Sequence, residues 1–315
     1  MSADPFSDIL RLTQAQSLVT GGFTASGPWA LRFPAPDKIK FFAVVKGHCW
    51  VTLEGLPEPA RFDTGDVGLL AAPRTSVLAS EPGLEPVDAM GLFSGSGNHW
   101  AQIGDGSEFA HIGGHVLLDA TSGPLLREAL PPWIHIRASS AHATAFSWLL
   151  DQLVQERAAP QPGGLLASAQ LSQLLFIQIL RAHLQDAPPL QAGWLRALGD
   201  PRIAPALRLM HNDPARDWHL QDLARACAMS RTTFATHFKA QAGVAPLTYL
   251  TDWRMRLAER ELAEDGNKPI GSIAQALGYT SESAFSNAFK RVTGRSPTAC
   301  RQAARAGTAS TLATS

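Results

Sequence analysis

The chain has 315 residues, of which 45% are hydrophobic and 17% charged, a composition typical of folded proteins and not of disordered ones. Its 27 basic and 27 acidic residues balance, but residues 201–306 carry a net charge of +6 and the remainder −6. A basic C-terminal region favours a nucleic-acid-binding module. No signal-peptide pattern opens the chain and no apolar run approaches the ~18 residues of a membrane span, so we expect a cytoplasmic protein without membrane contact.

Short apolar runs broken by glycine and proline predict β-strands in the N-terminal third of the chain. The expected strands are Trp29–Phe33, Lys40–Val45, His48–Glu54, Ala60–Gly65, Val67–Pro73 and Val77–Ser80. Many short strands at this spacing are typical of a β-barrel or jelly roll.

Two helical patterns follow, at Ala141–Glu156 and Leu165–Leu184, within a segment at 138–186. The second carries a broad apolar surface that packs on the barrel, pairs with a second chain, or both: Leu171, Leu174, Leu175, Ile177, Gln178 and Leu180. We expect this segment to pack or dimerise, and residues 187–200, rich in proline and glycine, to form a linker.

The C-terminal region contains an internal repeat with a constant offset of 51 residues. Its six matched pairs are Ser230/Ser281, Phe234/Phe285, Phe238/Phe289, Lys239/Lys290, Gly243/Gly294 and Pro246/Pro297. A second match lies upstream at an offset of 50, which pairs Leu220, Leu223 and Ala224 with Ile270, Ile273 and Ala274.

Each repeat predicts two short helices with a tight turn between them. The serines suit helix N-caps, the phenylalanines at i, i+4 spacing bury one face, and the glycines end the second helix. This pattern predicts two helix-turn-helix units, at about 220–240 and 270–292. A helix of about 20 residues between them would span ~30 Å, close to the ~34 Å between successive major-groove faces.

The C-terminal motifs resemble the AraC/XylS family of bacterial regulators over about residues 201–302. They are MSRTTF, the segment with Tyr249, Leu250, Trp253, Arg254 and Ala258, and then IAQALGY, SAFSNAFKR and TGRSPTACR. The resemblance implies seven helices, sequence-specific binding to double-stranded DNA, contact with RNA polymerase and a homodimer. In two departures, Ala228 stands where the family usually has glycine and Cys300 where an aromatic residue is common.

By register with the family, the base-reading positions fall on the exposed faces of the second helix of each unit. They are Arg231, Thr232, Ala235, Thr236, Glu282, Ser283 and Asn287. Arginine can read guanine, asparagine adenine and glutamate a cytosine amino group. The expected phosphate contacts are Lys239, Lys290, Arg291 and Arg295.

The N-terminal motifs GPWALRF, KFFAVVKGHCWVTLEG, RFDTGDVGLLAAP and LPPWIHI resemble the cupin-like effector domain of some AraC-type regulators, over about residues 5–137. The fold expected is therefore a multidomain β + α protein. It combines a cupin-like β-barrel and helical pair with an all-α double helix-turn-helix domain at 201–306 and a disordered tail at 307–315. A barrel mouth is a natural small-molecule pocket, and candidate effector-binding residues are Trp29, Phe42, His48 and Trp50.

The sequence favours a regulator without catalytic residue, metal or cofactor, controlled by a small molecule or a redox signal. Catalytic cupins use a His-x-His pair, whereas His48 is followed by Cys49 and Trp50; His99, His111 and His115 do not have the enzyme spacing. Cys49, next to a histidine, is either a redox sensor or a buried inert thiol. Three alternatives stay open: a metal-dependent cupin enzyme fused to a DNA-binding module, a DNA-repair alkyl acceptor, and an interaction protein that has lost DNA binding.

Overall fold

The computed structural model describes residues 4–56, 58–93, 100–158, 161–186, 192–264 and 267–312. The chain forms two compact units, each made of segments that are not contiguous in sequence. The β-sheet unit comprises Ala15–Leu118 and Leu130–Ala187, and the helical unit comprises Met1–Gln14, Asp119–Ala129 and Pro188–Ser315. This division differs from the boundaries expected from sequence, because residues 5–14 and 119–129 pack with the C-terminal helices.

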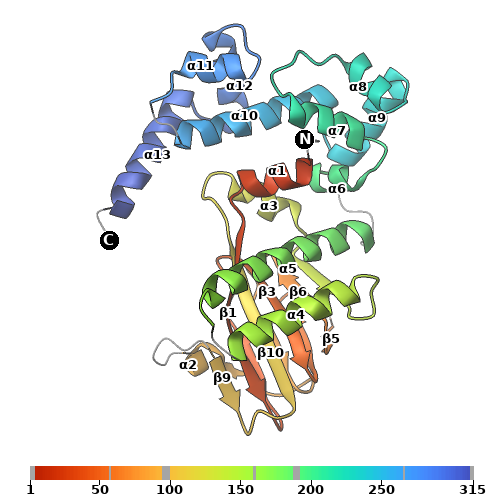
Figure 1. Ribbon diagram of the computed structural model, residues 1–315, viewed down its shortest axis with the longest axis vertical. Coiled ribbons are helices and arrows are strands. Elements are labelled where there is room, and N and C mark those ends of the chain that lie inside the picture. The colour runs from red at the N-terminus through yellow and green to blue at the C-terminus, as the bar shows by residue number, and fades with distance from the viewer. Residues whose placement is uncertain are drawn as a thin grey trace. The chain divides into compact units, whose positions relative to one another are not determined.

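The β-sheet unit has two sheets (Figure 1). The six-stranded sheet runs in the order β11 (Trp133–Ile136), β6 (Val67–Leu70), β3 (Ile39–Lys46), β10 (Phe109–Leu117), β1 (Gln16–Ala25), β9 (Trp100–Ile103). The five-stranded sheet runs β5 (Ala60–Asp63), β4 (His48–Leu53), β7 (Ser76–Ala79), β2 (Ala30–Phe33), β8 (Val87–Asp88). The parallel pairs are β1/β9 and β2/β8, and the other pairings are antiparallel. The six strands predicted from sequence are all present, within a few residues of their expected bounds.

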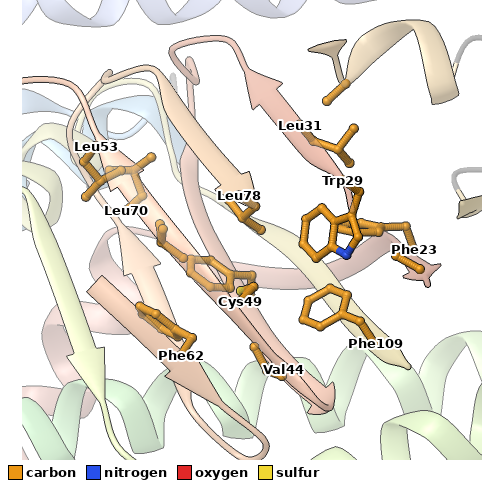
Figure 2. Close-up of a cluster of buried hydrophobic side chains, with 14 residues drawn as sticks. Phe23, Trp29, Leu31, Val44, Cys49, Leu53, Phe62, Leu70, Leu78 and Phe109 are labelled. Atoms are coloured by element: carbon orange, nitrogen blue, oxygen red, sulfur yellow. The ribbon is translucent and has the colours of Figure 1, made fainter. Parts of the chain in front are cut away.

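The core of this unit lies between the two sheets. Phe23 and Phe109 come from the six-stranded sheet and meet Leu31, Cys49 and Phe62 from the five-stranded sheet (Figure 2). Strand periodicity explains which side chains enter the core, since alternate side chains of a strand point to the same face. Along β4 the residues are in turn exposed, buried, half-buried, buried, exposed and buried. The short helix α2 (Met90–Phe93) follows β8.

Two long helices cover this unit, α4 (Ala143–Ala158) and α5 (Gly164–Asp186), which lie side by side (Figure 1). Helix α5 packs on β1, and its Gln173 and Ser172 side chains accept hydrogen bonds from the backbone of Ser17 and Val19, at 2.9 and 3.2 Å. Residues 164–185 are long and apolar enough to cross a membrane, with a mean hydropathy of 1.3. The hydrogen bonds to β1 and the full burial of Leu175 and Phe176 show that α5 packs on the β-sheet unit with one side.

The helical unit contains helices from three parts of the chain. They are α1 (Pro5–Leu12), α3 (Gly123–Ala129), α6 (Trp194–Gly199), α7 (Ala204–Asn212), α8 (Leu220–Ala226), α9 (Arg231–Ala242), α10 (Pro246–Glu264), α11 (Ile270–Ala276), α12 (Glu282–Thr293) and α13 (Pro297–Leu312). Helices α7 to α13 are the seven helices that the family resemblance implies. Helix α13 continues through 307–312, which were expected to belong to a disordered tail. Residues 313–315 lie outside the described part of the chain.

Helix α1 docks on the C-terminal helices through an apolar and a polar contact. Ile9 and Leu12 pack with Trp253 of α10. His211 of α7 stacks on Trp253, with ring centres 4.1 Å apart, and its two ring nitrogens lie 3.2 Å from an Asp8 carboxylate oxygen and 2.9 Å from the Tyr249 hydroxyl. Because His211 is 8% exposed, both partners are needed to satisfy its polar atoms.

The turn of the first helix-turn-helix unit places a non-glycine residue in the left-handed region. Ala228 has φ 52°, and the equivalent residue of the second unit is Gly278, with φ 82°. An L-residue in this region costs roughly 1–2 kcal/mol. The first unit therefore carries a local strain at the position where the sequence departs from the family.

We predict that Ala228→Gly stabilises the α8–α9 region by about 1 kcal/mol, because glycine relieves the left-handed strain. Hydrogen–deuterium exchange of α8 and α9 peptides should slow by about fivefold. The matched control is Ala240→Gly, at an exposed site inside α9, which should destabilise by roughly 0.5–1 kcal/mol. Faster exchange in Ala228→Gly, as in the control, would contradict the assigned strain.

Candidate nucleic-acid interface

Helices α9 and α12 are built alike and present one polar face each. The Ser230 hydroxyl caps α9 by accepting from the Thr233 N–H, and the Ser281 hydroxyl caps α12 by accepting from the Ala284 N–H, both at 3.2 Å. Gly243 ends α9 with φ 79°, and Gly294 ends α12 with φ 75°. These caps confirm the helix ends read from the repeat.

Two phenylalanine rings hold each of these helices to its core. Phe234 and Phe238 of α9 are fully buried with ring centres 5.6 Å apart, and Phe285 and Phe289 of α12 are fully buried at 5.7 Å. With one face fixed by aromatic burial, the opposite face of each helix is turned to solvent.

The sequence-predicted base-reading residues lie on those solvent faces. Six are exposed, Arg231, Thr232, Thr236, Glu282, Ser283 and Asn287, and Ala235 is half-buried. Within the described part of the chain, Arg231, Thr232 and Asn287 have no side-chain hydrogen bond or ion pair, so their polar groups are free for a ligand. The Glu282 carboxylate lies close to the backbone of α11: a Cβ atom built on Gly271 would be 3.1 Å from Glu282 Oε2.

The expected phosphate contacts are exposed as well: Lys239, Lys290, Arg291 and Arg295. Among the described residues none of these four has a carboxylate within 4.0 Å. Three of them lie in the last turn of α9 or α12, and Arg295 follows the glycine that ends α12. Unpaired cations flanking a polar helix face suit a polyanionic ligand.

The turns inside the two units have the same hydrogen bonds. Met229 N–H donates to Ala224 O and Tyr279 N–H donates to Ala274 O, each at 3.0 Å. Ala224 and Ala274 are both 1% exposed, where the second helix crosses closely. The repeat in sequence is thus a repeat of backbone geometry.

The candidate effector residues of the β-sheet unit divide between its two surfaces. Trp29 and Phe42 belong to the buried core, with 5% and 9% exposure. His48 and Trp50 lie on the opposite face of β4 from Cys49, and His48 is exposed. The expectation that all four line one pocket is corrected for His48 and Trp50, since the strand period of two turns them outward.

The core also contains His111, which the sequence suggested only as a candidate metal ligand. Its ring lies 5.0 Å from Phe23 and 5.7 Å from Phe42, and its Nδ1 is buried without a hydrogen-bond partner. Burial lowers the pKa of His111 to about 3, so the imidazole is neutral at physiological pH.

The histidines considered as metal ligands do not converge. The described residues contain no group of three or more His, Cys, Asp or Glu side chains placed to hold a metal ion. His111 and His115 are four residues apart on β10, which separates them by about 13 Å, and His48 faces outward. His99 lies outside the described residues. The described histidines are therefore not placed to share one metal ion.

The comparisons with known proteins agree with both units. Residues 4–185 match the family described as Cupin, and residues 223–303 match the family described as Helix-turn-helix domain. A putative AraC-like transcription regulator of Streptomyces lividans is 41% identical over 294 residues, covering 93% of this chain and 96% of that protein. A putative AraC-like transcription regulator of Streptomyces antibioticus is 40% identical over 294 residues, covering 93% and 97%.

More distant relatives include the transcriptional regulator AlkR of Acinetobacter baylyi, 31% identical over 88% of this chain and 92% of that protein. Among solved structures, the DNA-binding domain of AdpA in complex with a target DNA is 30% identical and covers 34% of this chain and 96% of its own, with a TM-score of 0.32. The curated relatives and the helix-turn-helix family match define a DNA-binding transcription regulator. The chain belongs to the family of AraC-like transcription regulators.

Cys49 has the properties of a packing residue. It is fully buried, and burial together with Asp66 and Asp63 raises the pKa of its thiol to about 12. Because the thiolate is the reactive form of cysteine, the raised pKa disfavours reaction of Cys49 at neutral pH.

We predict that a small alkylating reagent at pH 7.5 leaves Cys49 unmodified in the folded protein and modifies the half-exposed Cys227 first. Peptide mass spectrometry after brief treatment measures the modified fraction at each site. The control is the same reaction in denaturant, where both thiols should react alike. Modification of Cys49 as fast as Cys227 in the folded chain would revive the redox-sensor hypothesis.

Proposed function

We propose that one chain reads one DNA site with two helices, α9 and α12, placed in successive major grooves. The observation that carries this proposal is the pair of equally capped helices, each fixed by two buried phenylalanines and each presenting unpaired polar groups to solvent. Helix α10, with 19 residues and therefore a length of about 28 Å, joins the two units and is compatible with one turn of B-DNA.

The two readers differ in chemistry, which supports an asymmetric site of roughly 17–20 base pairs. The first presents Arg231, Thr232 and Thr236. Arginine suits guanine, and the threonine hydroxyls can bind to donors or acceptors on any base edge. The second presents Asn287, which suits adenine, and Glu282, which suits a cytosine amino group. Ala235 provides an apolar contact for a thymine methyl, and Ser283 accepts or donates to a base edge.

The β-sheet unit is proposed to receive the controlling signal, a small molecule, and to carry no catalytic activity. Support comes from the aromatic interior around Trp29 and Phe42 and from relatives that are named as transcription regulators. A ligand that binds one arrangement of the chain more tightly shifts the population toward it, and so changes DNA affinity. A cytoplasmic regulator of this kind would act by contact with RNA polymerase.

We predict that Arg231→Ala and Asn287→Ala each weaken binding to the preferred DNA site by about 1–3 kcal/mol and relax the preference at one base pair. Lys239→Ala should instead weaken binding on all sequences alike and reduce the salt slope by about 1. Fluorescence anisotropy on the preferred site and on single-base variants measures both effects. An equal loss on every DNA for Arg231→Ala and Asn287→Ala would remove them from the set of base readers.

A homodimer is proposed to form through an apolar surface on α4 and α5. The exposed apolar side chains there are Trp148, Leu165, Leu166 and Leu174, with exposures of 54%, 93%, 67% and 37%. Leu175 and Leu180, which the sequence predicts on one apolar surface with Leu174, are fully buried in the β-sheet unit. Helix α5 thus packs on the sheet with one side and keeps leucines free on another, and a second copy of the chain would cover them.

We predict that Leu165→Glu with Leu166→Glu weakens self-association at least tenfold, because a charged side chain in an apolar interface loses its hydration. Sedimentation velocity over a range of protein concentrations measures the dimer fraction. The matched control is Leu56→Glu, a 41% exposed leucine in the turn after β4. An unchanged dimer fraction in the double variant would show that the interface does not include Leu165 and Leu166.

A further inference from the structure

The DNA-binding helices form two lobes, each with its own hydrophobic core. The first lobe holds α8, α9 and the start of α10, around Phe234, Phe238 and Leu250. The second lobe holds the rest of α10 with α11 and α12, around Met255, Phe285 and Phe289. Helix α10 runs through both lobes (Figure 1). If α10 were the only connection between the two lobes, bending of this helix would make the distance between α9 and α12 variable.

A short loop of the first lobe, Asp213–Trp218, is held firmly to that lobe. The Trp218 indole is 5% exposed in the first core, and its Nε1–H donates to Asp213 O at 2.9 Å. The Arg216 guanidinium lies 4.1 Å from the centre of the Trp218 ring, and the Arg216 N–H donates to the Asp213 carboxylate at 3.2 Å. The loop therefore moves with the first lobe.

Arg254 of α10 connects this loop to the second lobe. Its Nε donates to Pro214 O at 2.5 Å and its Nη2 to Arg216 O at 2.8 Å. The same guanidinium lies 5.8 Å from the centre of the Tyr279 ring, which packs against the second core. One planar side chain thus contacts backbone of one lobe and an aromatic ring of the other.

Next to Tyr279, the backbones of the two lobes touch directly. A Cβ built on Gly278 would lie 2.0 Å from Ala215 O and 2.8 Å from the Ala215 carbonyl carbon. The equivalent position of the first unit is Ala228, which keeps a side chain at φ 52°. The left-handed turn alone therefore tolerates alanine, and it is the contact with Ala215 that requires glycine at 278.

We propose that Arg254 and Gly278 are positioning residues that fix the distance and angle between α9 and α12, so that the protein reads the spacing of its two half-elements as well as their bases. We call the contact of Arg254, Gly278 and Tyr279 with the 213–218 loop the interlobe bridge. Base contacts choose each half-element, and the bridge rejects pairs of half-elements at the wrong separation. The proposal rests on both helices binding one DNA site, as argued under the proposed function.

The bridge is tested first without DNA, by pulsed EPR on full-length protein. Spin labels are attached at the exposed sites Ala240→Cys in α9 and Ala284→Cys in α12, in a background with Cys227→Ser; Cys49 and Cys300 are buried. Gly278→Ala should shift or broaden the distance distribution between the labels. The matched control is Gly294→Ala, which has a similar left-handed φ of 75° and no neighbouring atom within 4 Å of the added Cβ.

Arg254→Gln provides a second variant that does not alter a turn, with Arg256→Gln as the control for loss of one charge on α10. Arg254→Gln should broaden the distribution, and Arg256→Gln should leave it as in the unsubstituted chain. Circular dichroism checks that each variant is folded. Identical distributions in Gly278→Ala, Arg254→Gln and their controls would overturn the bridge, whatever the protein does on DNA.

The consequence for recognition is tested on the preferred DNA site and on sites with one base pair added or removed between the half-elements. The unsubstituted chain should lose at least tenfold in affinity for each altered spacing, and Arg254→Gln should lose less than threefold. An Arg254→Gln variant that keeps the full tenfold discrimination would refute the role in spacing. A spacing-independent unsubstituted chain with intact EPR effects would instead contradict two-helix reading of one site.

Discussion

The burial of two phenylalanine rings beneath each recognition helix is the contact on which the DNA-binding domain depends. Phe234 with Phe238, and Phe285 with Phe289, are fully buried at i, i+4 spacing, and this fixes the rotation of each helix about its axis. Since the rotation is fixed, the polar residues on the other side, Arg231 among them, are held toward solvent. Removing a ring would leave a large cavity and allow the helix to rotate. The orientation of the polar surface therefore depends on the packing of the core.

The helical unit includes pieces from outside the C-terminal region. Helix α1 contributes Asp8 to the buried His211, and the Ser122 hydroxyl donates to Leu12 O at 2.7 Å. Strands β1 and β10 of the β-sheet unit begin and end close in sequence to these pieces, at Gln16 and Leu117. The chain therefore passes directly from these strands into the pieces that belong to the helical unit.

The sequence sufficed for whatever a local pattern determines. The offset repeat predicted the caps Ser230 and Ser281, the terminal glycines and the exposed polar faces, because spacing and residue type decide them, whereas the choice of base-reading residues on those faces came from the family resemblance. Contacts between residues far apart in the sequence could not be predicted from local patterns. The docking of α1 depends on His211 meeting Asp8, the exclusion of His48 from the core depends on strand parity across a whole sheet, and the glycine at 278 is explained only by the carbonyl of Ala215. The base-reading and effector assignments stay predictions.

Reading of one DNA site by both helices of one chain can be tested by selecting DNA from a random pool with the full-length protein. The minimal bound fragment and its stoichiometry are then measured by native mass spectrometry. We expect one chain to occupy two dissimilar half-elements in the same orientation, with centres about 10 base pairs apart. Two results would contradict the reading of two half-elements by one chain. One is a minimal fragment with a single half-element for each chain, and the other is a palindrome that binds only two chains, one on each half.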